Sequence, residues 1–162
     1  MAEQIKEVIK KEYIRCAQDP VYFLKKYCMI QHPIKGKIPF SLYPFQETTV
    51  NEIKDNRFNI ILKARQLGIS TLTAGYSLWM MTFFQDKNIL VIATKQDTAK
   101  NLVTKVRVMH ANLPSWLKQR CVEDNKLNLR YVNGSQIKAS ASGPEAARSE
   151  ALSLLILDEA AF

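Results

Sequence analysis

Cysteine and histidine are scarce in this 162-residue chain, and both shortages limit the disulfide bonds and metal sites that it could form. The three cysteines, Cys16, Cys28 and Cys121, are odd in number and far apart. This spacing gives neither the framework of a disulfide-rich secreted domain nor the ligand pairs of a zinc site, and it fits a reducing compartment. The two histidines, His32 and His110, are isolated. We therefore expect them to have structural or surface roles rather than to bind metal.

Long apolar runs are also missing. Residues 1–6 contain no apolar stretch, so the N-terminus lacks the pattern of a secretory signal peptide. The most apolar window, residues 72–84, is shorter than the about 20 residues that a membrane-spanning helix needs, and it is typical of a core helix. We expect no membrane partner.

Positive charge is in excess, because 23 Lys and Arg residues outnumber 15 Asp and Glu residues and give a net charge of +8. A positive chain favours polyanionic partners, and single-stranded or duplex nucleic acid is the obvious candidate. A basic surface without a specific partner is the alternative. The length and the 47% hydrophobic content predict one globular domain with a core, or one domain with a small appendage.

Residues 1–36 are expected to form a small helical appendage. Apolar residues recur with helical spacing over residues 3–17, and lysine and glutamate occupy the other face. Asp19 followed by Pro20 is typical of a helix N-terminus, and it predicts a second helix over residues 20–29.

Residues 37–162 are expected to form the main domain. Helical patterns alternate with short apolar runs, which predicts a mostly parallel α/β sheet flanked by helices. The chain ends directly after an apolar run, whereas a doubly wound sheet continues, so we expect this domain to be truncated. The predicted elements are a connector at 31–41 with a short edge strand, a helix at 42–56, a buried strand at 57–62, a helix at 69–84, a strand at 87–94, a helix at 97–111, a hairpin at 127–139 that turns at Asn133-Gly134, a short helix at 145–148 and a fully buried strand at 151–159.

A short polar loop, residues 63–68, is the centre of the chain. It follows the first predicted strand and precedes a helix, a layout in which backbone N–H groups and a helix N-terminus bind phosphate. The phosphate-loop pattern requires glycine, four residues, and then Gly-Lys-Ser or Gly-Lys-Thr. Gly68 and Ser70 fit, whereas Lys63 stands at the first glycine position and Ile69 at the lysine position. The loop is either a deviant phosphate binder or a coincidence.

The missing lysine has a candidate replacement. A bound phosphate needs a nearby cation, which Ile69 cannot supply. Lys63 is at the start of the loop, and its long side chain can reach the same phosphates from the other side. Arg65 can add a forked contact. The alternative is that Lys63 simply ends a strand at the surface.

Two carboxylates follow the last apolar run. Asp158 and Glu159 come at the end of residues 151–157, as in a nucleotide hydrolase. Asp158 would hold a Mg²⁺-bound water near the loop serine, and Glu159 would orient or deprotonate the attacking water. A strand that ends in two solvated acids is the alternative.

Two further polar residues are candidates for the same site. The Gln46 amide offers both a donor and an acceptor, so it can read an adenine edge. Arg148 comes ten residues before Asp158 and could stabilise charge on a transferring phosphoryl group, in its own or a neighbouring subunit. For both Gln46 and Arg148, an ordinary surface position is the alternative.

At these residues the chain resembles the large subunit of tailed-bacteriophage terminases, in its N-terminal ATPase half. Each motif is short, but their order and spacing are specific and cover nearly the whole chain. The matching stretches are Asp19-Pro20-Val21-Tyr22-Phe23 for the N-terminal helix, Leu42-Tyr43-Pro44-Phe45-Gln46 for the adenine-side motif, Arg65-Gln66-Leu67-Gly68-Ile69-Ser70-Thr71 for the loop, Ala93-Thr94-Lys95-Gln96 after the second core strand, Tyr131-Val132-Asn133-Gly134-Ser135 with Ala139-Ser140-Ala141-Ser142 and Arg148 for the hairpin and arginine, and Leu155-Ile156-Leu157-Asp158-Glu159-Ala160-Ala161-Phe162 for the acidic motif.

The resemblance implies a P-loop NTPase fold of the ASCE type. It implies ATP hydrolysis with Mg²⁺ that drives double-stranded DNA into a prohead. The implied partners are the portal protein, the small terminase subunit and further copies in a homo-oligomeric ring on the portal, all in the host cell cytoplasm. By position, Gln46 would bind adenine, Lys63, Arg65, Gln66, Gly68, Ser70 and Thr71 would hold phosphates, Ser70 and Asp158 would bind the metal ion, Glu159 would be the catalytic base and Arg148 the arginine finger.

Two departures and two alternatives stay open. Ile69 replaces a lysine that some members carry, while other members place it at the loop's start, as Lys63 does. The family's coupling motif and nuclease domain come after the acidic strand, so we expect no DNA cleavage by this chain. One alternative is a truncated module that binds nucleotide or DNA without turnover. Another is a P-loop translocase such as a helicase, although residues 158–161 lack the histidine of its Asp-Glu-x-His motif.

Overall fold

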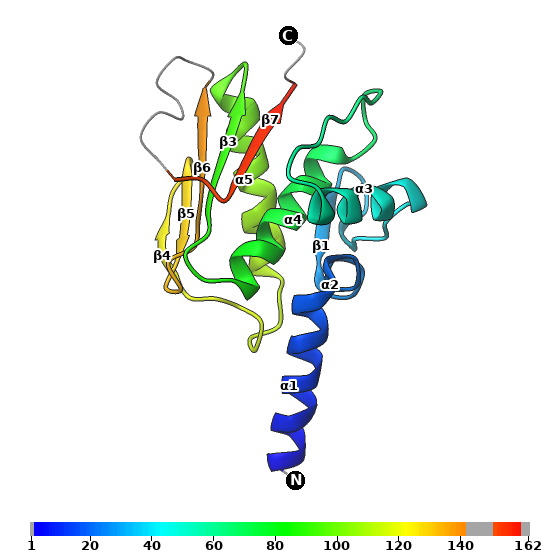
Figure 1. Cartoon of the computed structure of the whole chain (residues 1–162), viewed down its shortest axis with the longest axis vertical. Helices are drawn as coiled ribbons and strands as arrows, with labels where there is room; N and C mark the ends of the chain where they lie inside the picture. The colour runs from blue at the N-terminus through cyan, green and yellow to red at the C-terminus, as the bar shows by residue number, and fades with distance from the viewer. Residues whose placement is uncertain (1, 142–150, 160–162) are drawn as a thin grey trace.

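The computed structural model describes residues 2–141 and 151–159. A five-stranded sheet with the order β4-β5-β6-β3-β7 has helices on one face, and β1 and β2 form a second sheet (Figure 1). The elements are α1 (Ala2–Gln18), α2 (Pro20–Tyr27), β1 (Met29–His32), β2 (Gly36–Pro39), α3 (Pro44–Asp55), α4 (Ile69–Phe83), β3 (Asn88–Ala93), α5 (Gln96–Ala111), β4 (Cys121–Asp124), β5 (Asn128–Tyr131), β6 (Gln136–Ala141) and β7 (Leu154–Asp158).

The five-stranded sheet is mixed, so the prediction of a mostly parallel sheet is wrong. Strand β3 is parallel to both β6 and β7, whereas β5 is antiparallel to both β4 and β6. The reason is the hairpin at Asn133-Gly134, which the sequence did predict. Because a tight turn joins β5 to β6, the two strands enter the sheet as antiparallel neighbours.

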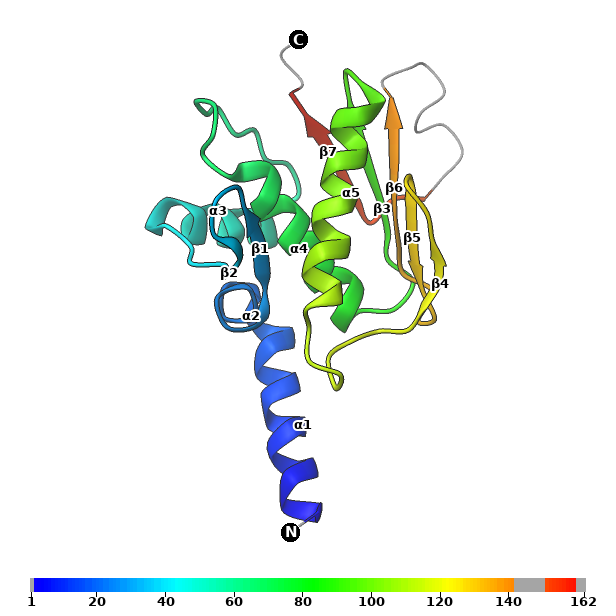
Figure 2. The ribbon, with the colours of Figure 1, turned by 180° about the vertical axis from the view of Figure 1, so that it is seen from behind.

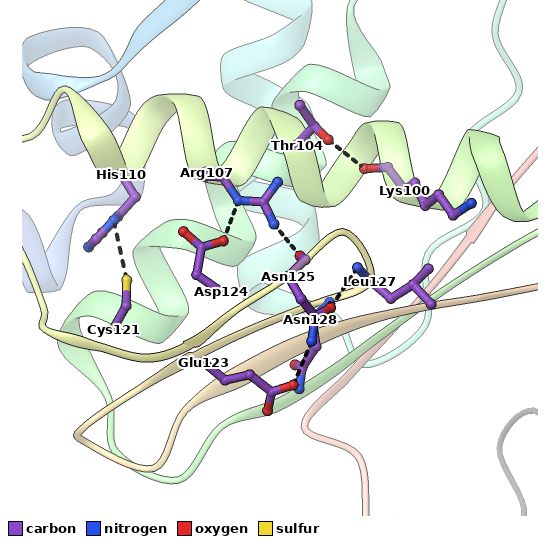
Figure 3. A network of polar contacts seen from close by, with 10 residues as sticks. All are labelled: Lys100, Thr104, Arg107, His110, Cys121, Glu123, Asp124, Asn125, Leu127 and Asn128. Atoms are coloured by element: carbon purple, nitrogen blue, oxygen red, sulfur yellow. Dashed lines mark hydrogen bonds and ion pairs between the residues drawn. The ribbon is translucent and has the colours of Figure 1, made fainter.

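Strand β4 was not predicted, because contacts from a distant helix hold its end. Arg107 of α5 donates from Nε to the carboxylate of Asp124 over 2.5 Å, and also to the backbone carbonyl of Asn125 (Figure 3). The Asn125 side-chain oxygen accepts the backbone N–H groups of Leu127 and Asn128, each at 2.9 Å. The turn after β4 is therefore fixed by polar side chains rather than by an apolar pattern.

The core lies between α5 and the sheet. Helix α5 crosses one face of the sheet, where it packs on β3 and β6, and α4 packs against α5 (Figure 2). Leu78 and Met81 of α4 are fully buried, as are Ile89 and Val91 of β3. The predicted helix at 69–84 and strand at 87–94 are therefore confirmed as α4 and β3.

Two other predictions of buried strands are wrong. Residues 58–64 have no regular secondary structure, and Ile60 and Leu62 are 100% and 101% exposed. Strand β7 forms, but only β3 pairs with it among the described strands, and Leu157 is 56% exposed. Both apolar runs lack a partner strand on at least one side, and an apolar pattern alone does not supply that partner.

The two N-terminal helices form as predicted, and α1 extends away from the sheet (Figure 1). The Asp19 carboxylate caps α2 by accepting the Tyr22 backbone N–H at 2.9 Å. A carboxylate on α1, Glu12, accepts hydrogen bonds from Lys26 at 2.8 Å, Tyr22 OH at 2.7 Å and Tyr27 OH at 2.8 Å. The hydrogen bond from Lys26 and those from the tyrosines lower the pKa of Glu12 to about 2.

The N-terminal helices share the core of the rest of the chain. Phe23 and Leu24 of α2 are fully buried, and the Trp79 indole of α4 donates to the Cys16 carbonyl at 2.9 Å. The predicted division into residues 1–36 and 37–162 stays a prediction. No helix in the described part of the chain is both long and apolar enough to cross a bilayer.

Candidate functional site

The predicted phosphate loop lies between α3 and α4, and its last residue begins α4. Gly68 is the N-cap of α4, and its carbonyl accepts the Leu72 backbone N–H at 2.9 Å. Gly68 has a φ of 72°, and a Cβ at this position would lie 2.8 Å from Nε2 of Gln46. Only glycine combines this backbone with so close a neighbour. Gln66 also has a left-handed backbone, with a φ of 63°.

A hydrogen bond joins the loop side of the site to the sheet. Ser70, in the first turn of α4, donates from Oγ to Oδ1 of Asp158 over 3.2 Å. Asp158 is the last residue of β7 and pairs in register with Ala93, the last residue of β3. The start of a helix therefore meets the carboxyl edge of the parallel strands, which is where open α/β sheets bind ligands.

A cavity of about 560 Å³ lies beside this hydrogen bond. It is lined by the segment before the loop, by α4 and by β7. Lys63 and Arg65 contribute two cations, and Asp158 and Glu159 contribute two carboxylates. Glu159 is exposed and has a φ of 57°. The cavity therefore combines groups that bind an anion with groups that can bind a divalent cation.

The cavity is also lined by residues that were not predicted from the sequence. Ile69, Thr73 and Tyr76 of α4 line it, together with Ile53 of α3. Burial raises the pKa of Tyr76, and the negative charge of Asp55 adds to this, so its hydroxyl stays neutral. Residues 69, 73 and 76 share one helical face, so the spacing that begins at Ile69 was the available signal.

Gln46 lies behind the loop rather than in the cavity lining. Its side chain is 3% exposed. Oε1 accepts the backbone N–H of Tyr43 at 3.0 Å, and Nε2 donates to the carbonyl of Leu67 at 2.9 Å. Both ends of the amide are thus bonded to backbone groups of this chain.

The remaining predicted residues are distributed as follows. Gln66 and Thr71 lie in the loop and in the first turn of α4, and neither lines the cavity. Arg148 lies outside the described residues, as does the predicted short helix around it. The structure therefore gathers Lys63, Arg65, Asp158 and Glu159 around one cavity and links Ser70 to Asp158.

A stretch of the sequence that begins just before the loop and includes the acidic strand matches a known protein family. The model of the family described as "Terminase large subunit, T4likevirus-type, N-terminal" matches residues 60–162. The chain belongs to this family. The matched span includes the loop, Ser70 and both carboxylates, but it begins after Gln46.

The fold of this terminase chain is similar to that in the crystal structure of the HK97 bacteriophage large terminase. The TM-score is 0.68 and the sequence identity 21%, over 87% of this chain. The match covers 30% of the HK97 protein, so the terminase chain described here spans about 30% of the length of that relative.

Proposed function

We propose that this terminase chain is the ATPase part of a viral DNA-packaging motor, with the P-loop NTPase fold of the ASCE type. It binds ATP with Mg²⁺ at the cavity beside the loop and hydrolyses it to move double-stranded DNA into a prohead. The observation that carries the proposal is the 3.2 Å hydrogen bond from Ser70 to Asp158, next to a cavity lined by Lys63, Arg65 and Glu159.

Asp158, which lines the cavity, and Ser70, which is hydrogen-bonded to it, suit Mg²⁺. The Ser70 hydroxyl and the Asp158 carboxylate are oxygen ligands, and Mg²⁺ prefers oxygen ligands with one or two carboxylates beside phosphate oxygens. When bound, the ion neutralises charge on the nucleotide phosphates. In this proposal Ser70 and Asp158 hold the ion, and their contact fixes the distance between the helix and the strand that carry them.

The phosphates are held by cations of the loop and by backbone groups. Lys63 supplies the charge that Ile69 cannot, and Arg65 adds a planar group suited to two phosphate oxygens. Gln66, Gly68, Ser70 and Thr71 add backbone or hydroxyl groups at the start of α4, where a helix N-terminus favours anions.

Glu159 is proposed as the catalytic base. It directly follows Asp158 and lines the same cavity, so its carboxylate can orient a water molecule and accept a proton from it. Arg148 stays the proposed arginine finger, from the same or a neighbouring subunit. The base and the metal-binding acid are adjacent in the chain, so any shift of β7 moves both.

The proposed partners follow from the family and from charge. Double-stranded DNA is supported by the net charge of +8. The portal protein, the small terminase subunit and further copies of the chain in a ring on the portal are proposed from family membership alone. The proposed location is the host cell cytoplasm.

One experiment separates binding from turnover in this chain. Glu159→Gln should lower ATP turnover by about two to four orders of magnitude, the usual contribution of a general base, while ATP affinity stays unchanged. Lys63→Ala should instead lower ATP affinity about tenfold to a hundredfold, because a charge-assisted contact is lost.

The matched controls are Lys35→Ala and Glu3→Gln, which remove exposed charges of the same sign away from the cavity. Both controls should bind and hydrolyse ATP as the unmodified chain does. Unchanged affinity in Lys63→Ala, or unchanged turnover in Glu159→Gln, would remove that residue from its proposed role.

Nucleotide binding without turnover is a second candidate. It is favoured by the exposure of Ile60, Leu62 and Leu157, which flank the cavity. Among the described strands only β3 forms sheet hydrogen bonds with β7, so β7 is held on one side. Catalysis needs rigidly positioned groups, and β7 carries Asp158. ATP binding that depends on Lys63, with no turnover in the unmodified chain, would select this candidate.

A further inference from the structure

The side chain of Gln46 connects the N-terminus of α3 to the phosphate loop. Gln46 is the third residue of α3, and Tyr43 is the N-cap of that helix. The amide oxygen accepts the Tyr43 N–H at 3.0 Å, and the amide nitrogen donates to the Leu67 carbonyl at 2.9 Å. Because one partner is a donor and the other an acceptor, they fix the orientation of the amide.

The Leu67 carbonyl lies directly before the turn that leads from the loop into α4. It belongs to the peptide bond that precedes Gly68, whose φ of 72° turns the chain into α4. The same amide nitrogen lies 2.8 Å from the position of a Cβ on Gly68, so Gln46 packs directly on this turn. Gln46 therefore holds the turn from which the first N–H groups of α4 emerge.

Reading an adenine base would require an amide that the base can reach. Gln46 is 3% exposed and does not line the cavity, and its oxygen and nitrogen already bond to backbone groups. One N–H and one lone pair of the amide remain unused, but a base could reach them only after the packing around this buried side chain opened. The contacts therefore favour a role in the shape of the loop.

We propose that Gln46 is a positioning residue: it fixes the turn at Leu67 and Gly68, and thereby sets affinity for the triphosphate irrespective of the base. This inference rests on the proposed nucleotide site. It predicts that loss of the amide weakens ATP, GTP and inorganic tripolyphosphate alike, because all three present the same phosphates to the loop.

The test uses Gln46→Met, which keeps the length of the side chain and its lack of charge but removes both hydrogen bonds. Affinities for ATP, GTP and inorganic tripolyphosphate are measured at a temperature where far-ultraviolet circular dichroism shows the variant to be as folded as the unmodified chain. Each affinity should fall about tenfold, the weight of one net hydrogen bond to a buried group. The ratio of ATP to GTP affinity should not change.

The matched control is Gln4→Met, the same substitution at an exposed position on α1. It makes the same chemical change far from the loop in the sequence and on another helix, so all three affinities should stay unchanged. A loss in Gln46→Met that is confined to ATP would overturn the inference and make Gln46 a base-reading residue. Unchanged affinities for all three ligands would also overturn it.

A second measurement needs no nucleotide. The backbone N–H groups of Thr71 and Leu72 donate to the Gly68 carbonyl at 3.1 and 2.9 Å, so their hydrogen exchange reports on the turn. Exchange should be about tenfold faster in Gln46→Met and unchanged in Gln4→Met. Equal exchange in Gln46→Met and the unmodified chain would overturn the inference even if no ligand bound, whereas failure of all three ligands to bind the unmodified chain would overturn only the proposed function.

Discussion

Two apolar runs of similar composition differ in this molecule: one forms a buried strand and the other is unpaired and exposed. Asn88–Ala93 forms β3, which lies between β6 and β7, and its Ile89 and Val91 are fully buried. Residues 58–62 pair with no described strand, and their Ile60 and Leu62 are fully exposed. Strand formation here follows the presence of neighbours on both sides more closely than it follows residue type.

The contrast has a functional side as well. The paired run, β3, contacts β6, β7 and α5. The unpaired run leads directly to Lys63 and Arg65 at the cavity. The residues proposed to bind phosphate are thus carried by the less constrained of the two segments. Three experiments can sharpen or break this comparison.

The largest effect is expected from a matched pair of substitutions in the two runs. Ile89→Ala should lower the free energy of unfolding by about 2–5 kcal/mol, because it leaves a cavity at a fully buried position. Ile60→Ala should change it by less than about 0.5 kcal/mol, because that side chain is already in solvent. Urea unfolding followed by tryptophan fluorescence measures both, and equal losses would show that residues 58–62 are packed in solution.

A smaller effect is expected in limited digestion with trypsin. Cleavage after Arg57, Lys63 or Arg65 should be roughly tenfold to a hundredfold faster than after Lys87, since β3 must open before its flank fits a protease. Mass spectrometry of the products over time gives the order. Cleavage after Lys87 at an equal rate would mean that β3 opens as easily as the unpaired run.

The smallest effect concerns the contact between α1 and α2 in acid, in a part of the chain that is packed as β3 is. The folded-state pKa of Glu12 is about 2, below its ordinary value of 4.5, so its stabilising contribution is complete above pH 4.5 and is lost as the pH falls toward 2. At neutral pH, Glu12→Gln should lower the free energy of unfolding by about 1 kcal/mol, since three donors lose a charged acceptor.

The difference between Glu12→Gln and the unmodified chain should shrink as the pH falls from 4.5 toward 2, because the Glu12 carboxylate of the unmodified chain then becomes protonated in the folded state as well as in the unfolded state. Unfolding curves across that range measure it. Glu3→Gln, an exposed substitution on the same helix, serves as the control and should leave stability unchanged throughout. A difference that is independent of pH would assign the contribution of Glu12 to packing rather than to charge.

Features set by nearby residues could be predicted from the sequence. The apolar pattern of α4, the Asp19 cap and the turn at Asn133-Gly134 each depend on interactions within a few residues, and all three are present. The open side of β7 and the unpaired run at 58–62 could not be predicted, because they depend on which distant strands are available as partners.

The candidate site also has a part that could be predicted from the sequence and a part that could not. The expectation that a cation at the loop's start and two acids at the end of the last strand would lie together came from a predicted strand–loop–helix layout. The strand at 57–62 does not form, but Lys63, Asp158 and Glu159 do line one cavity. The contacts of Gln46 could not be predicted, because its partners are backbone groups whose positions depend on the path of the loop. A side-chain amide gives no sign in the sequence of which backbone it will bind.

The left-handed backbone at Gln66, Gly68 and Glu159 has a consequence for how freely the sequence can vary. β-Branched side chains are poorly tolerated in this conformation, whereas glycine and asparagine enter it readily. A random library across these three codons should therefore lose valine, isoleucine and threonine at positions 66 and 159 and retain little but glycine at 68. That bias would arise in a screen for folding alone, before any selection for a reaction.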